Sequence, residues 1–215
     1  MSALSDEVTI RPARFVLATF NRDKARELEA LLAQPGLTLV SLAEFPDAVA
    51  PEENGASLLD NALIKAAAAL RVAGLPAIAD DTGLEVDALG GAPGIHAARY
   101  AGPEATYADN VRLLLERLAG VPLERRGARF RTVCLALFPD GTRPVGEGTL
   151  AGRITTVPRG SHGFGYDPVF ELPALGLTLA ELPEAEKNAI SHRARAARDL
   201  ARRLFGDGSV GVEGP

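Results

Sequence analysis

Short apolar runs alternate with amphipathic stretches over the first eighty residues, and this alternation limits the folds open to the chain. Phe15–Ala18 and Leu37–Leu42 are strand candidates, and Arg22–Ala33 between them has the spacing of an amphipathic helix. A longer helix is expected over Ser57–Ala73, followed by a short buried strand over Pro76–Ala79. Strands that alternate with helices favour an α/β fold.

The second half of the chain adds a predicted antiparallel pair of strands. Arg129–Phe138 and Arg143–Leu150 are joined by a Pro-Asp-Gly-Thr turn, which is typical of a hairpin. Helices are expected over Thr106–Leu118 and Ser191–Phe205. Together with the alternating first half, this hairpin predicts an α/β fold built on a mixed sheet.

Length and composition limit the domain organisation and the partners. The chain of 215 residues is 47% hydrophobic, which predicts one folded domain over residues 14–205, an N-terminal extension (1–13) and a flexible tail (206–215). A formal net charge of -5 argues against a nucleic-acid partner. The sequence contains no long apolar run and no signal-type N-terminus, so we expect a cytoplasmic protein without a membrane partner. The single cysteine, Cys134, suits a reducing compartment.

Lysine is rare in this chain. Of the 23 basic residues only three are lysine, Lys24, Lys65 and Lys187, and the rest are arginine. A GC-rich coding sequence explains the bias itself. A compact ammonium group is not interchangeable with a planar guanidinium, so the three lysines are candidates for phosphate contacts.

The first of these lysines follows a predicted strand-to-helix junction, Thr19–Lys24. Backbone N–H groups and the helix dipole make such a junction a favourable place for an anion. The sequence does not contain the glycine-rich P-loop pattern. A structural alternative stays open, in which Asn21 only caps the helix and Lys24 is solvated.

Two adjacent carboxylates, Asp80 and Asp81, follow the predicted strand Pro76–Ala79. Ligands of α/β sheets bind at the carboxyl ends of strands, and neighbouring strand residues point to opposite faces, so one carboxylate is expected to face a cleft. A carboxylate there can hold Mg²⁺ or accept a proton from water. Glu53, in an acidic loop, becomes relevant only if it converges on the same place. The alternative is that Asp80 and Asp81 form a turn or a helix cap.

Two further segments suit a planar, anionic ligand. In the glycine-rich segment 160–167, Phe164 and Tyr166 could stack on a base and Asp167 could accept from ring N–H groups, unless the aromatic rings pack into the core. His192 and Arg193 are donors near the start of the last helix. Phosphate, metal and aromatic-base chemistry together indicate a nucleotide ligand handled with Mg²⁺.

These segments make the chain resemble the inosine/xanthosine triphosphate pyrophosphatase family from about residue 15 to residue 204. The resemblance rests on six segments in order: VLATFNRDKARELEALL, EENGASLLDNALIKA, AIADDTGLEVDALGGAPGIHAARYAG, FRTVCLALF, HGFGYDPVF and LPEAEKNAISHRARA. It implies an elongated two-lobed α/β fold around a twisted mixed sheet, with the nucleotide in the cleft between the lobes, and a homodimer.

The resemblance also implies the site residues. Asp81 is the implied general base, and Glu53 and Asp81 are the implied Mg²⁺ ligands. The implied substrate contacts are Thr19, Phe20, Asn21, Arg22, Asp23, Lys24, Lys65, Thr82, Phe164, Gly165, Tyr166, Asp167, Lys187, His192 and Arg193. Phe20 departs from the family, which usually has glycine or serine at this position.

The implied reaction is hydrolysis of non-standard purine nucleoside triphosphates (ITP, dITP and XTP) to the monophosphate and pyrophosphate, which cleanses the nucleotide pool. Water would attack the α-phosphorus, and His192 and Arg193 would donate to the 6-oxo oxygen of the base. Two alternatives stay open. One is a pyrophosphatase for modified pyrimidine triphosphates, and the other is a nucleotide-binding sensor that does not hydrolyse its ligand.

Overall fold

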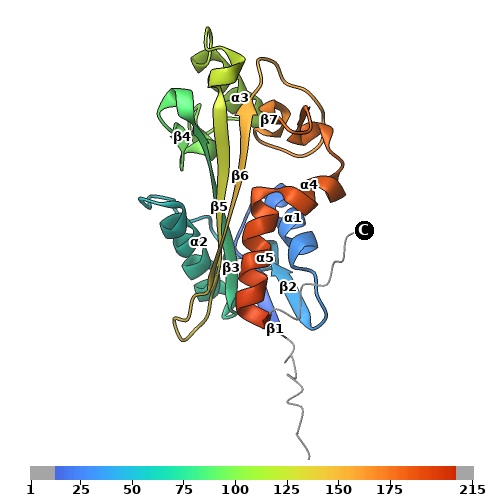
Figure 1. Cartoon of the computed structure of the whole chain (residues 1–215). Helices are drawn as coiled ribbons and strands as arrows, with labels where there is room; N and C mark the ends of the chain where they lie inside the picture. The colour runs from blue at the N-terminus through green and yellow to red at the C-terminus, as the bar shows by residue number, and fades with distance from the viewer. Residues whose placement is uncertain (1–12, 207–215) are drawn as a thin grey trace, which may run out of the picture.

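Three long strands form the centre of the molecule. They are β3 (Ala77–Val86), β5 (Gly127–Leu137) and β6 (Val145–Ile154), and they run side by side along most of the molecule's length (Figure 1). This computed structural model describes residues 13–206. The β5–β6 pair is antiparallel over nine residue pairs, which confirms the predicted hairpin.

The sheet contains eight strands and is mixed. The remaining strands are β1 (Ala13–Leu17), β2 (Leu37–Ser41), β4 (Pro93–Gly94), β7 (Phe170–Leu172) and β8 (Leu177–Thr178). The order is β2-β1-β3-β5-β6-β7-β8, and β4 pairs with β3. The pairs β1–β2 and β1–β3 are parallel and the others are antiparallel, so the predicted α/β fold with a mixed sheet is confirmed.

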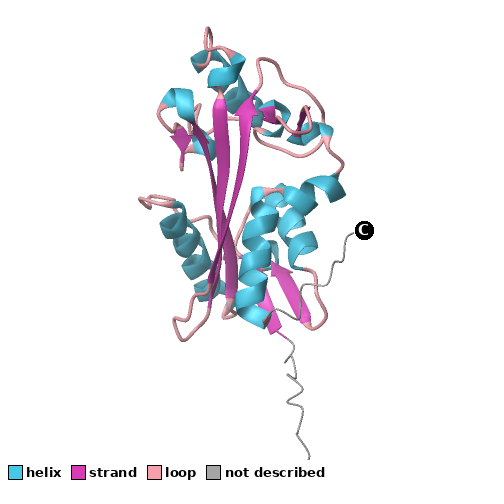
Figure 2. Cartoon of the chain, in the orientation of Figure 1, coloured by secondary structure: helices cyan, strands magenta, loops and turns pink. Residues whose placement is uncertain are grey.

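Five α-helices lie within residues 13–206, and Figure 2 shows them grouped toward the two ends of the long strands. They are α1 (Arg22–Leu32), α2 (Leu58–Ala73), α3 (Tyr107–Arg117), α4 (Glu184–Ile190) and α5 (His192–Phe205). The four predicted helices are confirmed, and a polar side chain caps the start of each. The capping residues are Asn21, Ser57, Thr106 and Ser191.

Helices cover both faces of the sheet at the end that carries β1 and β2. Ile78 and Cys134 belong to an apolar cluster with α1 and α5, whereas Ala79 and Leu135 belong to a second cluster with α2. Neighbouring residues of β3 and β5 therefore point to opposite faces. At the other end of the long strands, a third cluster joins the sheet to α3 and to the segment that contains β7.

One predicted boundary is wrong, and one short helix was not predicted. The strand expected over Pro76–Ala79 continues to Val86, because β3 pairs with β5 along its whole length. Lys187 lies within α4, which immediately precedes α5. This short helix was not predicted, because it has seven residues and no side-chain cap at its start.

The predicted terminal segments lie largely outside the described part of the chain, which excludes residues 1–12 and 207–215. Strand β1 begins at Ala13 and the end of α5 is followed by Gly206. Among the helices of residues 13–206, none is long and apolar enough to cross a bilayer.

Candidate active site

A cavity of about 780 Å³ lies where the β1–α1 junction, α2, β3 and the glycine-rich segment 160–167 meet. Its lining includes most of the residues singled out in the sequence. They are Thr19, Phe20, Asn21, Lys24, Glu53, Lys65, Asp81, Thr82, Phe164, Gly165, Tyr166, Asp167, Lys187, His192 and Arg193. Arg22 and Asp23, which the sequence also suggested, do not line it.

The β1–α1 junction presents one wall of the cavity. The Oδ1 atom of Asn21 accepts hydrogen bonds from the backbone N–H groups of Asp23 and Lys24, at 3.0 and 3.1 Å. Thr19 Oγ1 accepts the N–H of Asn21 at 3.1 Å. Asn21 thus caps α1, which was the structural alternative left open by the sequence. The cap also fixes the first turn of α1, from which the Lys24 side chain reaches the cavity. Phe20 is 49% exposed.

Asp80 and Asp81 lie in the middle of β3 and not at its end, contrary to the expectation from the sequence. Aspartate is disfavoured in strands. Here β5 pairs with β3 beyond both residues, and cations neutralise each carboxylate. Asp81 lines the cavity and Asp80 does not, which confirms that one of the two faces the cleft.

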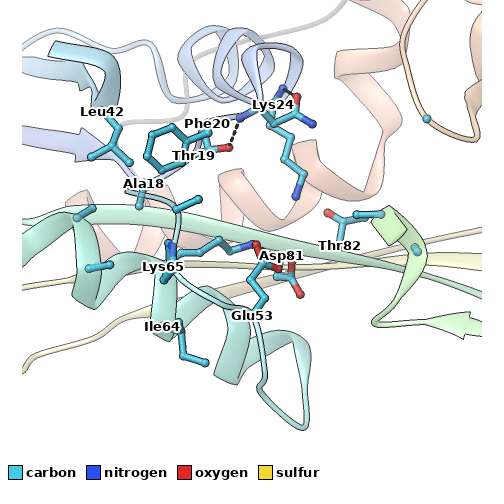
Figure 3. Close-up of a pocket in the computed structure, with 18 of the residues that line it drawn as sticks. Ala18, Thr19, Phe20, Lys24, Leu42, Glu53, Ile64, Lys65, Asp81 and Thr82 are labelled. Atoms are coloured by element: carbon cyan, nitrogen blue, oxygen red, sulfur yellow. Dashed lines mark hydrogen bonds and ion pairs between the residues drawn. The ribbon is translucent and has the colours of Figure 1, made fainter. Parts of the chain in front are cut away.

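Lys65 joins the two acids that the sequence suggested as metal ligands. Its Nζ lies 2.8 Å from Asp81 Oδ1 and 3.5 Å from Glu53 Oε1. Figure 3 shows Lys65 reaching across from α2 to Asp81, with Glu53 beside it and Lys24 approaching from α1. Burial alone would lower the pKa of Lys65, but Asp81, Asp80 and Glu53 outweigh burial and raise it, so the ammonium group stays charged.

The loop that carries Glu53 is anchored to its surroundings. The backbone carbonyl of Glu53 accepts a hydrogen bond from Arg99 at 2.8 Å. The N–H of Gly55 donates to Asn61 Oδ1 at 2.9 Å, and the amide of Asn61 donates to Asp81 Oδ2 at 3.3 Å. Asn61 therefore links the acidic loop to β3 and brings Glu53 toward Asp81.

On the opposite face of β3, Asp80 lies between two cations. Arg193 Nε donates to its Oδ2 at 3.1 Å, and Lys24 Nζ is 3.5 Å from the same atom. Burial favours the protonated acid, but Lys24 and Arg193 outweigh it and hold the pKa of Asp80 well below its usual value. Burial lowers the pKa of Lys24 in spite of the attraction of Asp80. The attraction of Asp80 thus only partly offsets the cost of burying a positive charge on Lys24.

Lys187 and Arg193 belong to a buried network that Glu27 holds together. Lys187 Nζ donates to Glu27 Oε1 at 2.7 Å and also to Asp167, while Arg193 donates to Glu27 Oε2. Burial would raise the pKa of Glu27, but Arg193 and Lys187 outweigh burial and lower it. The network fixes the start of α5 against α1, and Lys187 and Arg193 border the cavity with most of their donors already bound.

The two aromatic residues of the glycine-rich segment have different environments. Phe164 lies in the cavity wall, with the Tyr107 ring 5.7 Å away, Lys187 Nζ 4.9 Å away and Arg193 Cζ 5.3 Å away, each measured to the Phe164 centroid. Tyr166 is buried in the core, and its hydroxyl donates to the carbonyl of Ala97 at 2.8 Å. Phe164 thus has the more accessible face for a planar ligand.

His192 is the first residue of α5 and lies at the back of the cavity. Its ring stacks on Phe130 with centroids 4.5 Å apart, and its Nδ1 lies 2.6 Å from Thr132 Oγ1. Burial, followed by the positive charges of Arg193 and Lys187, lowers the pKa of His192 well below its usual value. The imidazole is therefore neutral at physiological pH.

Sequence reasoning missed two residues of this site. Tyr107 accepts a hydrogen bond from the Asn21 amide at 2.8 Å and lines the cavity beside Phe164. No local pattern identifies it, because it is 86 residues from Asn21. Glu27 did leave a signal, because it is an acid on the same face of α1 as Lys24 and the apolar Leu28 and Leu31.

The donor set at Glu53 and Asp81 is suited to Mg²⁺. Hard carboxylate oxygens are its preferred ligands, and Mg²⁺ is usually held by one or two carboxylates together with substrate phosphates. Within residues 13–206, no group of three or more His, Cys, Asp or Glu side chains is arranged around a common metal position. The two acids fit a metal that completes its coordination with substrate and water.

The fold and cavity define an α/β protein that gathers lysines, two carboxylates and a partly exposed aromatic ring at one place. The chain belongs to the Ham1 family, which it matches over residues 15–203. It is 53% identical to a dITP/XTP pyrophosphatase of Methylococcus capsulatus, covering 89% of this chain and 96% of the relative. It is 51% identical to the enzyme of the same name from Geobacillus kaustophilus, covering 86% and 91%.

Solved structures agree with this assignment. A HAM1 protein from Coxiella burnetii matches with a TM-score of 0.81 and 39% identity, over 89% of this chain and 98% of that one. A nucleoside-triphosphatase/dITP/XTP pyrophosphatase from Mycobacterium abscessus matches with a TM-score of 0.70 and 43% identity, over 87% and 98%.

Proposed function

We propose that this protein hydrolyses non-standard purine nucleoside triphosphates, with dITP and XTP as its substrates, to the monophosphate and pyrophosphate. The observation that carries the proposal is the convergence of Lys24, Lys65, Glu53 and Asp81 in one cavity that Phe164 borders. Two relatives at 51–53% identity, both dITP/XTP pyrophosphatases, support it. ITP, which shares the base of dITP, is proposed as a further substrate.

The phosphates would lie at the β1–α1 junction. Lys24 and Lys65 approach this part of the cavity from α1 and α2, so a triphosphate there meets positive charge from two sides. Glu53 and Asp81 would hold Mg²⁺, which neutralises phosphate charge when bound. Asp81 would accept the proton of the water that attacks the α-phosphorus. Charge on the departing pyrophosphate would be stabilised by Lys24 and Lys65.

The base would lie toward the glycine-rich segment. Phe164 offers an aromatic face there, while His192 and Arg193 border the same part of the cavity. The molecule would then have two lobes, with the nucleotide in the cleft between them. Helices α1 and α2 would border the phosphate end of the nucleotide, and the segment 160–167 would border the base. We also propose that the protein is a homodimer, which the mass measured by light scattering during size-exclusion chromatography would test.

Incubation with Mg²⁺ and dITP, XTP, GTP or ATP in parallel, followed by chromatography, tests the activity. The proposal expects monophosphate from dITP and XTP and little product from ATP or GTP. Turnover of a modified pyrimidine triphosphate in place of dITP would favour the pyrimidine alternative. Equilibrium binding of dITP without product would favour a sensor that does not hydrolyse its ligand.

A further inference from the structure

Two hydroxyl groups, one of buried Thr132 and one of Thr82 in the cavity wall, connect His192 to Asp80. Thr132 Oγ1 lies 2.6 Å from His192 Nδ1 and 2.7 Å from Thr82 Oγ1. Thr82 Oγ1 in turn lies 3.3 Å from Asp80 Oδ2. Thr82 and Thr132 are direct partners in the β3–β5 register, so the sheet itself holds the two hydroxyl groups together.

The chemistry of the groups at the Asp80 end sets the direction of these hydrogen bonds. Asp80 lies between Lys24 and Arg193 and is a carboxylate, which can only accept. A hydroxyl oxygen that turned a lone pair toward this carboxylate would be repelled by it, so Thr82 donates its hydrogen to Asp80 Oδ2, 3.3 Å away. The guanidinium of Arg193 can only donate, and its Nη2 lies 3.3 Å from Thr82 Oγ1. One lone pair of Thr82 Oγ1 therefore accepts a hydrogen bond from Arg193. The other lone pair accepts the hydroxyl hydrogen of Thr132.

The same reasoning extends to the imidazole. Thr132 has a single hydroxyl hydrogen, which it donates to Thr82, so toward His192 it can only accept. The neutral ring of His192 must then carry its proton on Nδ1. Its other nitrogen, Nε2, has no hydrogen-bond partner among residues 13–206, and His192 lines the cavity. Nε2 is therefore an acceptor.

The backbone around His192 keeps the ring in this position. Strand β6 has glycine at position 148, opposite Thr132 in the β5–β6 register. A Cβ atom there would collide with the carbonyl oxygen of His192 and would lie 2.6 Å from the N of Ala196. Gly148 thus lets the start of α5 approach the sheet, and Phe130 stacks on the ring from the side. Small rotations of the ring are restricted.

We propose that Thr132 is a positioning residue that holds His192 in the Nδ1–H form, so that Nε2 accepts a hydrogen bond from the base of the substrate. The inference deepens the proposed function and rests on it for the identity of the ligand. The matching ligand is a purine that carries hydrogen on N1, as 6-oxopurines do. A 6-aminopurine presents a lone pair at N1, which would face the lone pair of Nε2. The assignment gives His192 the opposite role from the donor expected from the resemblance.

The protonation of His192 can be measured without any turnover. Long-range ¹H–¹⁵N spectra of the imidazole groups distinguish Nδ1–H from Nε2–H, and a His192→Ala variant assigns the signal among the three histidines. The proposal expects the proton on Nδ1 in the ligand-free wild-type protein. A proton on Nε2 would overturn it, even if the protein proves to be an active dITP pyrophosphatase.

Two substitutions at Thr132 test its consequence for specificity. Thr132→Ser keeps the hydroxyl group, and the imidazole proton should stay on Nδ1 with little change in kcat/KM for dITP. Thr132→Val removes the hydroxyl group, and kcat/KM for dITP should fall about 10- to 100-fold relative to that for dATP. An unchanged ratio of dITP to dATP in Thr132→Val would overturn the role of Thr132. Absence of activity on dITP in the wild type would refute the proposed function alone, because the spectra report the tautomer independently.

Discussion

The Nζ of Lys65 lies 2.8 Å from Asp81 Oδ1, so the central lysine of the cavity is bound to the carboxylate that we propose as the general base. The same ammonium group is 3.5 Å from Glu53. Lys65 thus forms ion pairs with both acids. A triphosphate would attract Lys65 and a divalent cation would attract the two acids, so both ligands would replace parts of these ion pairs.

Asp81→Asn tests the proposed base. The amide keeps the shape of the side chain but cannot accept a proton from water, so kcat for dITP should fall by about 10²- to 10⁴-fold. The Asp81→Asn variant should still bind a non-hydrolysable dITP analogue, which calorimetry would measure. A variant that retains the wild-type kcat would show that another group accepts the proton.

Glu53→Gln tests the metal site. Loss of one carboxylate ligand should raise the Mg²⁺ concentration for half-maximal activity by at least about 10-fold. Removal of a group that only supports a metal ligand already weakens metal binding by about this factor. Glu52→Gln is the matched control, since Glu52 is the adjacent acid but is exposed and does not line the cavity. Equal Mg²⁺ requirements in the two variants would contradict a metal role for Glu53.

Lys24→Ala tests the phosphate contact at the β1–α1 junction. Removal of the ammonium group should raise KM for dITP by about 10- to 100-fold, because a hydrogen bond to a charged group is lost. Arg26→Ala serves as the control, because Arg26 lies on the same helix with a side chain that is 59% exposed. An unchanged KM in Lys24→Ala, measured from initial rates, would place Lys24 outside the substrate site.

Glu27→Gln should destabilise the fold by about 3–5 kcal/mol, because it leaves two buried cations without their shared carboxylate. The pKa of Glu27 is lowered in the folded state by Arg193 and Lys187, against the effect of burial. Its contribution is therefore complete above the ordinary value of 4.5 and is lost as the pH falls through the folded pKa.

Urea unfolding between about pH 3 and pH 7 measures this contribution. The wild type should lose stability below the ordinary carboxyl pKa, and Glu27→Gln should lose less over the same range. Glu29→Gln, at an exposed position of α1, should behave as the wild type does. Parallel pH profiles for all three proteins would contradict the role given to the Glu27 network.

Local sequence patterns predicted the elements of this fold well where a single residue marks a boundary. Asn21, Ser57 and Ser191 cap helices by side-chain bonds to neighbouring N–H groups, which are short-range interactions. The end of β3 could not be placed in this way. Asp80 and Asp81 normally disfavour a strand, and the cations and the β5 pairing that stabilise them come from distant parts of the chain.

The site residues also differ in how far the sequence alone could indicate them. Lys24 and Lys65 were found because they are rare in an arginine-rich sequence, and the structure brings both to one cavity. The bond of Lys187 to Glu27 spans 160 residues, so no spacing in the sequence indicates it. Tyr166 had the right residue type for stacking on a base, but its hydroxyl has a buried backbone partner and its ring packs in the core.

In the proposed reaction, water attacks the α-phosphorus and Asp81 accepts its proton. Hydrolysis of dITP in H₂¹⁸O, followed by mass spectrometry of both products, tests it directly. We expect one ¹⁸O atom in the monophosphate and none in the pyrophosphate. Label in pyrophosphate, or release of labelled orthophosphate, would place the attack at another phosphorus and contradict the geometry proposed around Asp81.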